Sequence, residues 1–347
     1  MNFFRRKRAE PPVMTLEGIL GPNSRLDEAA AISVAGPEAI TVTADGELLV
    51  SAGRMVHALS RWGEVLRPWG QFDRPVSALA ASEGGLVAVG LSGGGICVHD
   101  MSGQPLDWVV PAETVQAADL LFVSESELAV VDHGYGPERD VLSLAPWDDT
   151  RRGKVWSVPR EGTHRALAGD LHCPAGICRD GGGEVIVTEM EAARAITLSG
   201  AVRRAGFPAY VGRIRKIDGG YLLCGLSRRD PLIEFLKTEK DFVAEMKATI
   251  EPRHWISPRT TPEFSHDFPI ELGATRLFGA VKPWAPSFSY GLLITLDEDL
   301  MPVGSAQSRA DGRRHAICDA TVWNGDVIAV SRASGEILNL GPKEGGR

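Results

Sequence analysis

Residues 36–53 read GPEAITVTADGELLVSAG, which is two short apolar runs on either side of the pair Asp45-Gly46. Alternating apolar positions that flank a residue pair able to take positive φ predict two strands joined by a tight hairpin turn. Glu38 lies just ahead of the first of these strands. The same layout recurs along the chain, so we expect the feature that Glu38 faces to be shared by the other copies.

The layout of a polar turn followed by a short apolar strand has five further copies. They occupy residues 83–89, 125–131, 182–187, 218–223 and 324–330. Repeats of roughly 40 residues with about four short strands each are typical of propeller blades, which stack because one small sheet cannot bury both of its faces alone. The sequence therefore predicts an all-β chain folded as a six-bladed β-propeller. A two-sheet sandwich is also compatible with the pattern alone.

A long interval separates the fifth and sixth repeat strands. Within it, residues 231–236 and 241–247 show the helical spacing of apolar side chains. We expect a short helical insertion at residues 230–265, which either packs over one end of the propeller or closes its central opening as a lid. The expected organisation is a flexible basic segment at 1–15, one propeller at 16–340 and a flexible tail at 341–347.

Composition and charge exclude several classes of function. The net charge of −8 argues against nucleic-acid binding, which needs a basic surface. The basic run Arg5-Arg6-Lys7-Arg8 has no apolar segment behind it, so we expect no signal peptide and no membrane-spanning segment. This end of the chain is either frayed or docks on an anionic membrane surface. Five widely spread cysteines predict reduced thiols and a cytoplasmic location.

Several motifs occur in an order that is informative. They are Gly36-Pro37-Glu38, Cys173-Pro174-Ala175-Gly176-Ile177, Phe207-Pro208-Ala209-Tyr210, Cys224-Gly225-Leu226-Ser227 and Tyr290-Gly291-Leu292-Leu293. This order resembles the strictosidine synthase-like proteins, which belong with the gluconolactonase-type (senescence marker protein) six-bladed propellers. The resemblance implies a protein that acts on a small molecule in its central channel, as a lactone or ester hydrolase. The alternative is a non-catalytic propeller that binds a small ligand or a protein partner.

The resemblance also implies a divalent cation, usually calcium, held in the channel by a glutamate and by asparagine or aspartate side chains of other blades. Glu38 matches the glutamate, but Ala118 and Ala175 stand where oxygen ligands are expected, and Arg213 places a cation at another of these positions. Because calcium needs 6 to 8 oxygen ligands, we expect either no cofactor or a poorly held Ca²⁺. Arg213 is expected to take the place of the metal and to pair with Glu38.

The remaining candidates lie at strand ends. Cys318 stands where the resemblance places the glutamate for amine condensation, so that reaction is not expected, and its neighbour Asp319 is either a general base or a structural acid. Asp132 and His133 could form an acid/base pair, although adjacent strand residues face opposite ways. The candidate catalytic residues are Asp119, Asp132, His133 and Asp319, and the candidate substrate-binding residues are His172, Arg213 and Cys318. Substrate, oligomeric state and catalytic competence stay open.

Overall fold

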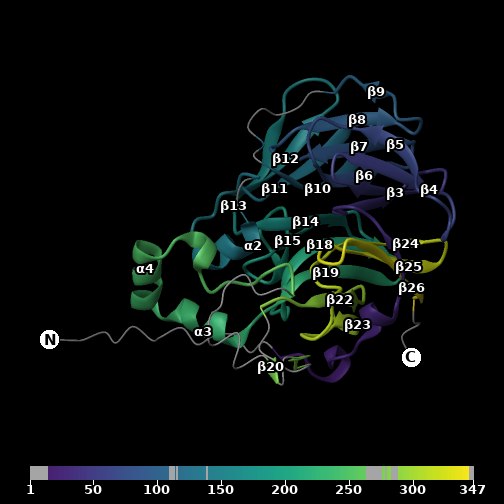
Figure 1. The fold of residues 1–347 in the computed structure, drawn as a ribbon. Helices are drawn as coiled ribbons and strands as arrows, with labels where there is room; N and C mark the ends of the chain where they lie inside the picture. Colours follow the sequence, from purple (N-terminus) through teal and green to yellow (C-terminus); the bar gives the residue numbers. More distant parts are fainter. Residues whose placement is uncertain are drawn as a thin grey trace.

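The computed structural model describes residues 15–108, 114, 116–137, 140–262, 276–277, 280–282 and 288–343. The basic run near the N-terminus and the last four residues lie outside this part of the chain, and so do residues 263–265 of the expected insertion. Six antiparallel sheets, each of four strands, make up most of the described chain. The expected six-bladed β-propeller is confirmed (Figure 1).

The first three blades follow one another along the chain, each built from four consecutive strands. Blade one consists of β2 (Ile40–Val42), β3 (Leu48–Ala52), β4 (Met55–Leu59) and β5 (Arg67–Gln71). Blade two consists of β6 (Val76–Ala81), β7 (Leu86–Leu91), β8 (Ile96–Asp100) and β9 (Pro105–Leu106). Blade three consists of β10 (Ala117–Ser124), β11 (Glu127–Asp132), β12 (Gly153–Pro159) and β13 (Arg165–Leu171).

Blade four again has four consecutive strands, whereas blades five and six do not. Blade four consists of β14 (Pro174–Arg179), β15 (Val185–Glu189), β16 (Arg194–Thr197) and β17 (Val202–Ala205). Blade five consists of β18 (Ala209–Ile217), β19 (Gly220–Arg228), β22 (Gly291–Leu296) and β23 (Pro302–Ser308). Blade six consists of β24 (Ile317–Trp323), β25 (Asp326–Ser331), β26 (Glu336–Pro342) and β1 (Ala30–Ser33).

Blade six joins the two ends of the chain. Its outermost strand, β1, pairs antiparallel with β26, with Ile32 opposite Ile337. This pairing closes the ring, because the strand that completes the last blade comes from the start of the chain. The sequence analysis did not predict this closure. Strand β26 also runs to Pro342, two residues into the segment expected to be a tail.

The second strand of each blade supplies most of the core. Strands β3, β7 and β11 are buried along nearly their whole length, so they appear in the sequence as continuous apolar runs. Between blades one and two, Leu49 and Val56 pack in one cluster with Val87 and Val89. The hairpin turn before β25 has positive φ at both Asn324 and Gly325, which is the geometry of a tight two-residue turn. Local turn chemistry therefore sets the strand boundaries, and packing between blades stabilises the ring.

The first strands β2, β6, β10, β14, β18 and β24 contact one another in a closed circle around the central channel. In four of them one residue is left out of the pairing register: Ser77, Ala118, Ala175 and Cys318. Such a β-bulge leaves the carbonyl group of the extra residue free for a different donor. In β18 the irregular stretch is longer and runs from Val211 to Ile214.

The expected helical insertion is present inside blade five, between β19 and β22. It contains α3 (Pro231–Thr238), α4 (Lys240–Thr249) and the 3₁₀ turn η3 (Pro252–His254), followed by the short strands β20 (Arg276–Leu277) and β21 (Ala280–Val281). The other short helices are η1 (Gly18–Leu20), α1 (Arg25–Glu28), α2 (Val141–Leu144) and η2 (Ala145–Trp147). Figure 1 shows α4 at the edge of the molecule, away from the centre of the ring. In the part of the chain that is described, no helix is long and apolar enough to cross a membrane.

Ion pairs hold α3 against blades four and five. Arg229 donates to the carboxylate of Glu234 on α3 at 2.8 Å and to the backbone carbonyl of Glu191 at 2.8 Å. Lys237 pairs with the carboxylate of Glu191, and the Tyr210 hydroxyl donates to Glu234 at 3.0 Å. We call these five residues the insert cluster.

Candidate functional site

A cavity of about 340 Å³, the axial pocket, opens at one end of the central channel. Its lower tier comes from the first strands of the blades or the residues beside them, and consists of Glu38, Ser77, Ala118, Ala175, Gly212 and Cys318. Its upper tier comes from the ends of the second strands, and consists of Gly53, Ser92, His133, Met190, Leu226 and Arg332. Each blade therefore contributes at least one residue to each tier, because the blades repeat the same register around the channel.

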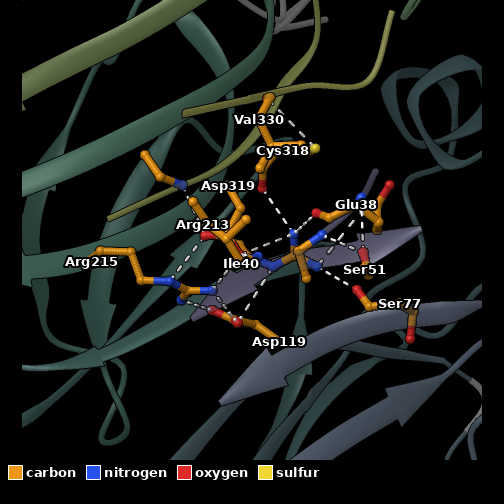
Figure 2. A network of polar contacts seen from close by, with 12 residues as sticks. Glu38, Ile40, Ser51, Ser77, Asp119, Arg213, Arg215, Cys318, Asp319 and Val330 are labelled. Atoms are coloured by element: carbon orange, nitrogen blue, oxygen red, sulfur yellow. Dashed lines mark hydrogen bonds and ion pairs between the residues drawn. The ribbon is translucent and has the colours of Figure 1, made fainter. Parts of the chain in front are cut away.

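The Arg213 guanidinium lies among backbone groups at the first strands of four other blades (Figure 2). Arg213 also lines the axial pocket, and we call it the floor of the pocket. One terminal nitrogen donates to the carbonyl oxygens of Glu38 at 2.6 Å and Cys318 at 2.9 Å. The other donates to the carbonyl oxygens of Ser77 at 2.5 Å and Ala118 at 2.8 Å. Three of these acceptors, Ser77, Ala118 and Cys318, are bulge residues, so the side chain satisfies buried carbonyl groups that the sheets leave unpaired.

Arg213 belongs to a buried group of two arginines and two aspartates, here called the axial cluster. Arg215 binds the Asp119 carboxylate through both of its terminal nitrogens, at 2.7 and 2.8 Å, and its Nε lies 3.0 Å from Asp319. Arg213 lies 3.4 Å from Asp119 and 3.7 Å from Asp319. Both aspartates have no exposed surface. Arg213 and the two aspartates are thus removed from water, Arg215 keeps 17 % of its side-chain surface exposed, and the pairing of the four charges offsets their desolvation.

The charge state of the axial cluster follows from these contacts. Burial acts to lower the pKa of Arg213, but the carboxylates of Asp319, Asp119 and Glu38 outweigh it and raise that pKa overall. Burial likewise acts to lower the pKa of Arg215, and the two aspartates raise it well above its ordinary value. Both guanidinium groups therefore remain charged at every pH at which the protein is folded.

The two aspartates are occupied as acceptors. Asp119 accepts the N–H of Ile177 at 2.9 Å in addition to the Arg215 contacts. Asp319 accepts the N–H groups of Ile40 at 3.1 Å and Ala320 at 2.9 Å. Neither aspartate lines the axial pocket. They lie behind Arg213 and hold it, which differs from the substrate-facing catalytic position expected from the sequence.

Glu38 lies on the wall of the pocket beside the floor. Its carboxylate is 3.9 Å from Arg213, in agreement with the expected proximity of the two side chains. Its closest partner is Arg332, which contacts both carboxylate oxygens, at 2.8 and 2.5 Å. Burial acts to lower the pKa of Arg332, but Glu38 raises it overall. The pocket wall therefore carries a bidentate ion pair that the sequence analysis missed.

A signal for Arg332 exists in the repeat pattern. Arg332 directly follows β25, as His133 follows β11 and Met190 follows β15. Aligning the repeats by the ends of their second strands would have placed Arg332 in the same ring as His133. The partner itself could not be read in this way, because Glu38 and Arg332 are separated by 294 residues.

His133 lines the pocket and Asp132 does not, consistent with the alternation of strand residues. The Nδ1 atom of His133 accepts the N–H of Tyr135 at 3.1 Å. Burial, together with the nearby Arg332 cation, lowers the pKa of His133 to about 4. The ring is therefore neutral near pH 7 and carries its proton on Nε2. Asp132 instead accepts the N–H of Gly134 at 2.8 Å, in the turn.

Cys318 and His172, the last two candidates, have different environments. Cys318 lines the pocket and is buried, and burial raises the pKa of its thiol to about 12, so it is not a thiolate at neutral pH. His172 does not line the pocket; its ring contacts the carbonyl of Asp148 at 3.1 Å. Glu189 and Arg194, outside the pocket, form an ion pair at 2.5 Å.

The residues at the channel axis do not fit a divalent cation. A guanidinium fills the space into which the carbonyl groups of four blades point, and the oxygen atoms that could bind a metal already accept its N–H groups. Among the described residues, no group of three histidine, cysteine, aspartate or glutamate side chains gathers in a way that could hold a metal ion. No step of a reaction is therefore derived through a metal.

Comparison with known proteins agrees with the fold. No protein-family model and no curated protein matches the sequence. A nidogen/laminin complex aligns over 55 % of this chain and 72 % of that chain, with 15 % identity and a TM-score of 0.43, which is too low to bear on function. An X-ray structure of a protein provisionally named as a gluconolactonase aligns over 90 % of this chain and 93 % of that chain, with 13 % identity and a TM-score of 0.52. The chain is thus similar in fold to a gluconolactonase-type propeller.

Proposed function

We propose that this propeller binds a small, uncharged polar molecule in the axial pocket and does so without a metal and without catalysis. The observation that carries the proposal is the floor of the pocket, where an arginine bonded to four blades closes the channel. A pocket of about 340 Å³ that is open at one end suits a small molecule.

The lining residues favour an uncharged ligand with both donor and acceptor groups. Glu38 offers a carboxylate as acceptor, and His133 offers its Nε2–H as donor. Arg332 is already neutralised by Glu38, and the carboxylate of Asp140 acts on it as well. Met190 and Leu226 supply an apolar wall. Hydroxyl and carbonyl groups, as in sugars and lactones, would meet these partners without leaving a charge unpaired.

The alternative function is hydrolysis of a lactone or ester, and the fold similarity supports it. The pocket chemistry weighs against it. A general base needs a free lone pair near the substrate. His133 has its Nδ1 lone pair engaged by Tyr135, and Cys318 is a neutral thiol. Glu38 has both carboxylate oxygens bonded to Arg332. Asp119 and Asp319 lie behind Arg213.

A panel of neutral sugars, lactones and their ring-opened acids, measured by calorimetric titration and thermal shift, tests the proposal. We expect neutral members to bind and the ring-opened acids to bind more weakly. Glu38→Gln should weaken binding by about tenfold or more, since a hydrogen bond to a charged group contributes about 1.5–3 kcal/mol. Glu64→Gln, a change at an exposed residue, is the control.

The same panel is followed by chromatography for turnover, with and without calcium. Binding without product formation supports the proposal. Product formation that Glu38→Gln or His133→Phe abolishes would establish the hydrolase instead, and the absence of binding throughout the panel would reject an uncharged ligand of this class.

A further inference from the structure

The guanidinium of Arg213 occupies a cage of oxygen atoms. Four backbone carbonyl oxygens lie 2.5–2.9 Å from its terminal nitrogens. Carboxylate oxygens of Asp119, Asp319 and Glu38 lie 3.4, 3.7 and 3.9 Å from its nitrogens. Seven oxygen atoms from four blades thus converge on one cation. This number lies in the range of 6 to 8 oxygen ligands that calcium takes.

The backbone around Arg213 is adapted to place this side chain. A Cβ atom at Gly176 of blade four would lie 2.6 Å from the Cα of Arg213, so a glycine is needed where the two strands approach. The Thr188 hydroxyl donates to the carbonyl of Gly212 at 2.7 Å, within the irregular stretch of β18. The arginine is 4 % exposed and therefore has no solvent to balance its charge. Among the described residues, the oxygen cage is what compensates this charge.

We propose that Arg213 is a covalently attached structural cation that makes the propeller independent of metal ions, and that shortening it converts the oxygen cage into a calcium site. In the native protein the guanidinium supplies positive charge and N–H donors to carbonyl groups that would otherwise be buried without partners. Without it, the same carbonyls and carboxylates surround an empty space of negative potential, for which a hard divalent cation is the matching occupant. This inference does not depend on which ligand the axial pocket binds.

The native protein provides the first test. Elemental analysis after purification and thermal unfolding with excess chelator or excess calcium measure its dependence on metal. We expect no stoichiometric metal and the same Tm under both conditions. A bound equivalent of metal, or a Tm that falls on chelation, would overturn the proposal.

The second test replaces Arg213 by alanine. In chelator, R213A should unfold roughly 5–15 °C below the native protein, since it leaves buried acids and carbonyls unpaired. Calcium should recover part of this loss, and titration should show one site. Arg203→Ala, at a surface arginine that pairs with Asp180 and Glu184, is the matched control. Its Tm should change neither with chelator nor with calcium. An R213A protein that is as stable as the native one, or whose Tm ignores calcium, would contradict the inference.

Arg213→Lys and Arg213→Met keep the test decisive if R213A does not fold. The lysine retains a cation with three donors, whereas the methionine fills similar volume without charge. A lysine variant that is clearly more stable than the methionine variant in chelator supports a cation at this position. Equal stability of the two would show that the side chain acts by filling space, and the proposal would fail.

Discussion

The axial cluster and the insert cluster both start from blade five, and they stabilise different parts of the molecule. The axial cluster starts from β18 and reaches the first strands of blades one, two, three and six. The insert cluster starts from Arg229, just after β19, and reaches α3 and the residue Glu191 beside blade four. Both use arginine against carboxylates and carbonyls at similar distances. Their difference shows that the importance of a buried ion pair depends on which elements it joins.

The two clusters also differ in how completely they are satisfied. Both aspartates of the axial cluster accept several hydrogen bonds each. In the insert cluster, Glu191 Oε2 and Arg229 Nε are buried without a hydrogen-bond partner among the described residues, against one such atom, Arg213 Nε, in the axial cluster. Unsatisfied buried groups reduce the net gain from burying charge. We therefore expect the insert to detach at a lower free energy than the ring opens.

Replacing Arg215 with alanine should have the largest effect. Asp119 and Asp319 would lose their closest charged partner while buried, and we expect a loss of about 3–5 kcal/mol in the free energy of unfolding of the whole propeller. Urea denaturation followed by circular dichroism measures this loss. The control Arg54→Ala, at an exposed residue, should change stability by less than about 0.5 kcal/mol. A loss under about 1 kcal/mol for Arg215→Ala would contradict the inference that the axial cluster stabilises the whole propeller.

Replacing Arg229 with alanine should have a smaller, local effect of about 2 kcal/mol, because Lys237 still compensates Glu191 and Glu234. Amide hydrogen exchange should speed up in α3 and α4 and stay unchanged in β3 and β7. Lys247→Ala, at an exposed position of α4, is the control. If the core strands exchange faster as well, the two clusters are coupled and the comparison is wrong.

Removing the cap of α3 should cost less again. The Asp230 carboxylate accepts the N–H of Leu232 at 2.8 Å at the start of this helix. Asp230→Ala should lower helix stability by about 1 kcal/mol, visible as faster exchange confined to α3. Asp230→Asn, which retains a capping oxygen, should restore most of the protection. Equal exchange in both variants would assign the effect to something other than the cap.

Acid should produce the smallest effect and should act on the insert. Burial acts to raise the pKa of Glu234, but Arg229 and Lys237 lower it below its ordinary value of 4.5 overall. The stabilising contribution of Glu234 is therefore complete above its unfolded pKa and is lost as the pH falls through its lower folded pKa. Exchange of α3, corrected for intrinsic rates, should accelerate below about pH 4.5. Glu234→Gln should remove this dependence, and an unchanged acid response in that variant would point to another group.

Local patterns in the sequence account for much of the fold. The Asp45-Gly46 turn with its flanking apolar runs predicted β2 and β3, and the equivalent repeats predicted the second strand of every blade. Helical spacing after Asp230 predicted α3 and α4. These predictions succeeded because turns, alternation and helical spacing each involve only a few neighbouring residues. The closing strand β1 was missed because its partner lies at the other end of the chain.

For the site, the sequence by itself identified Glu38, Arg213, His133 and Cys318, all of which line the axial pocket. The tertiary structure alone decided that Asp119 and Asp319 lie behind Arg213, that Arg332 is the main partner of Glu38, and that the guanidinium binds four carbonyl groups. The reason is physical. A residue type shows which bonds a side chain can form, but the bulges and the closure of the ring determine which distant backbone groups come within its reach.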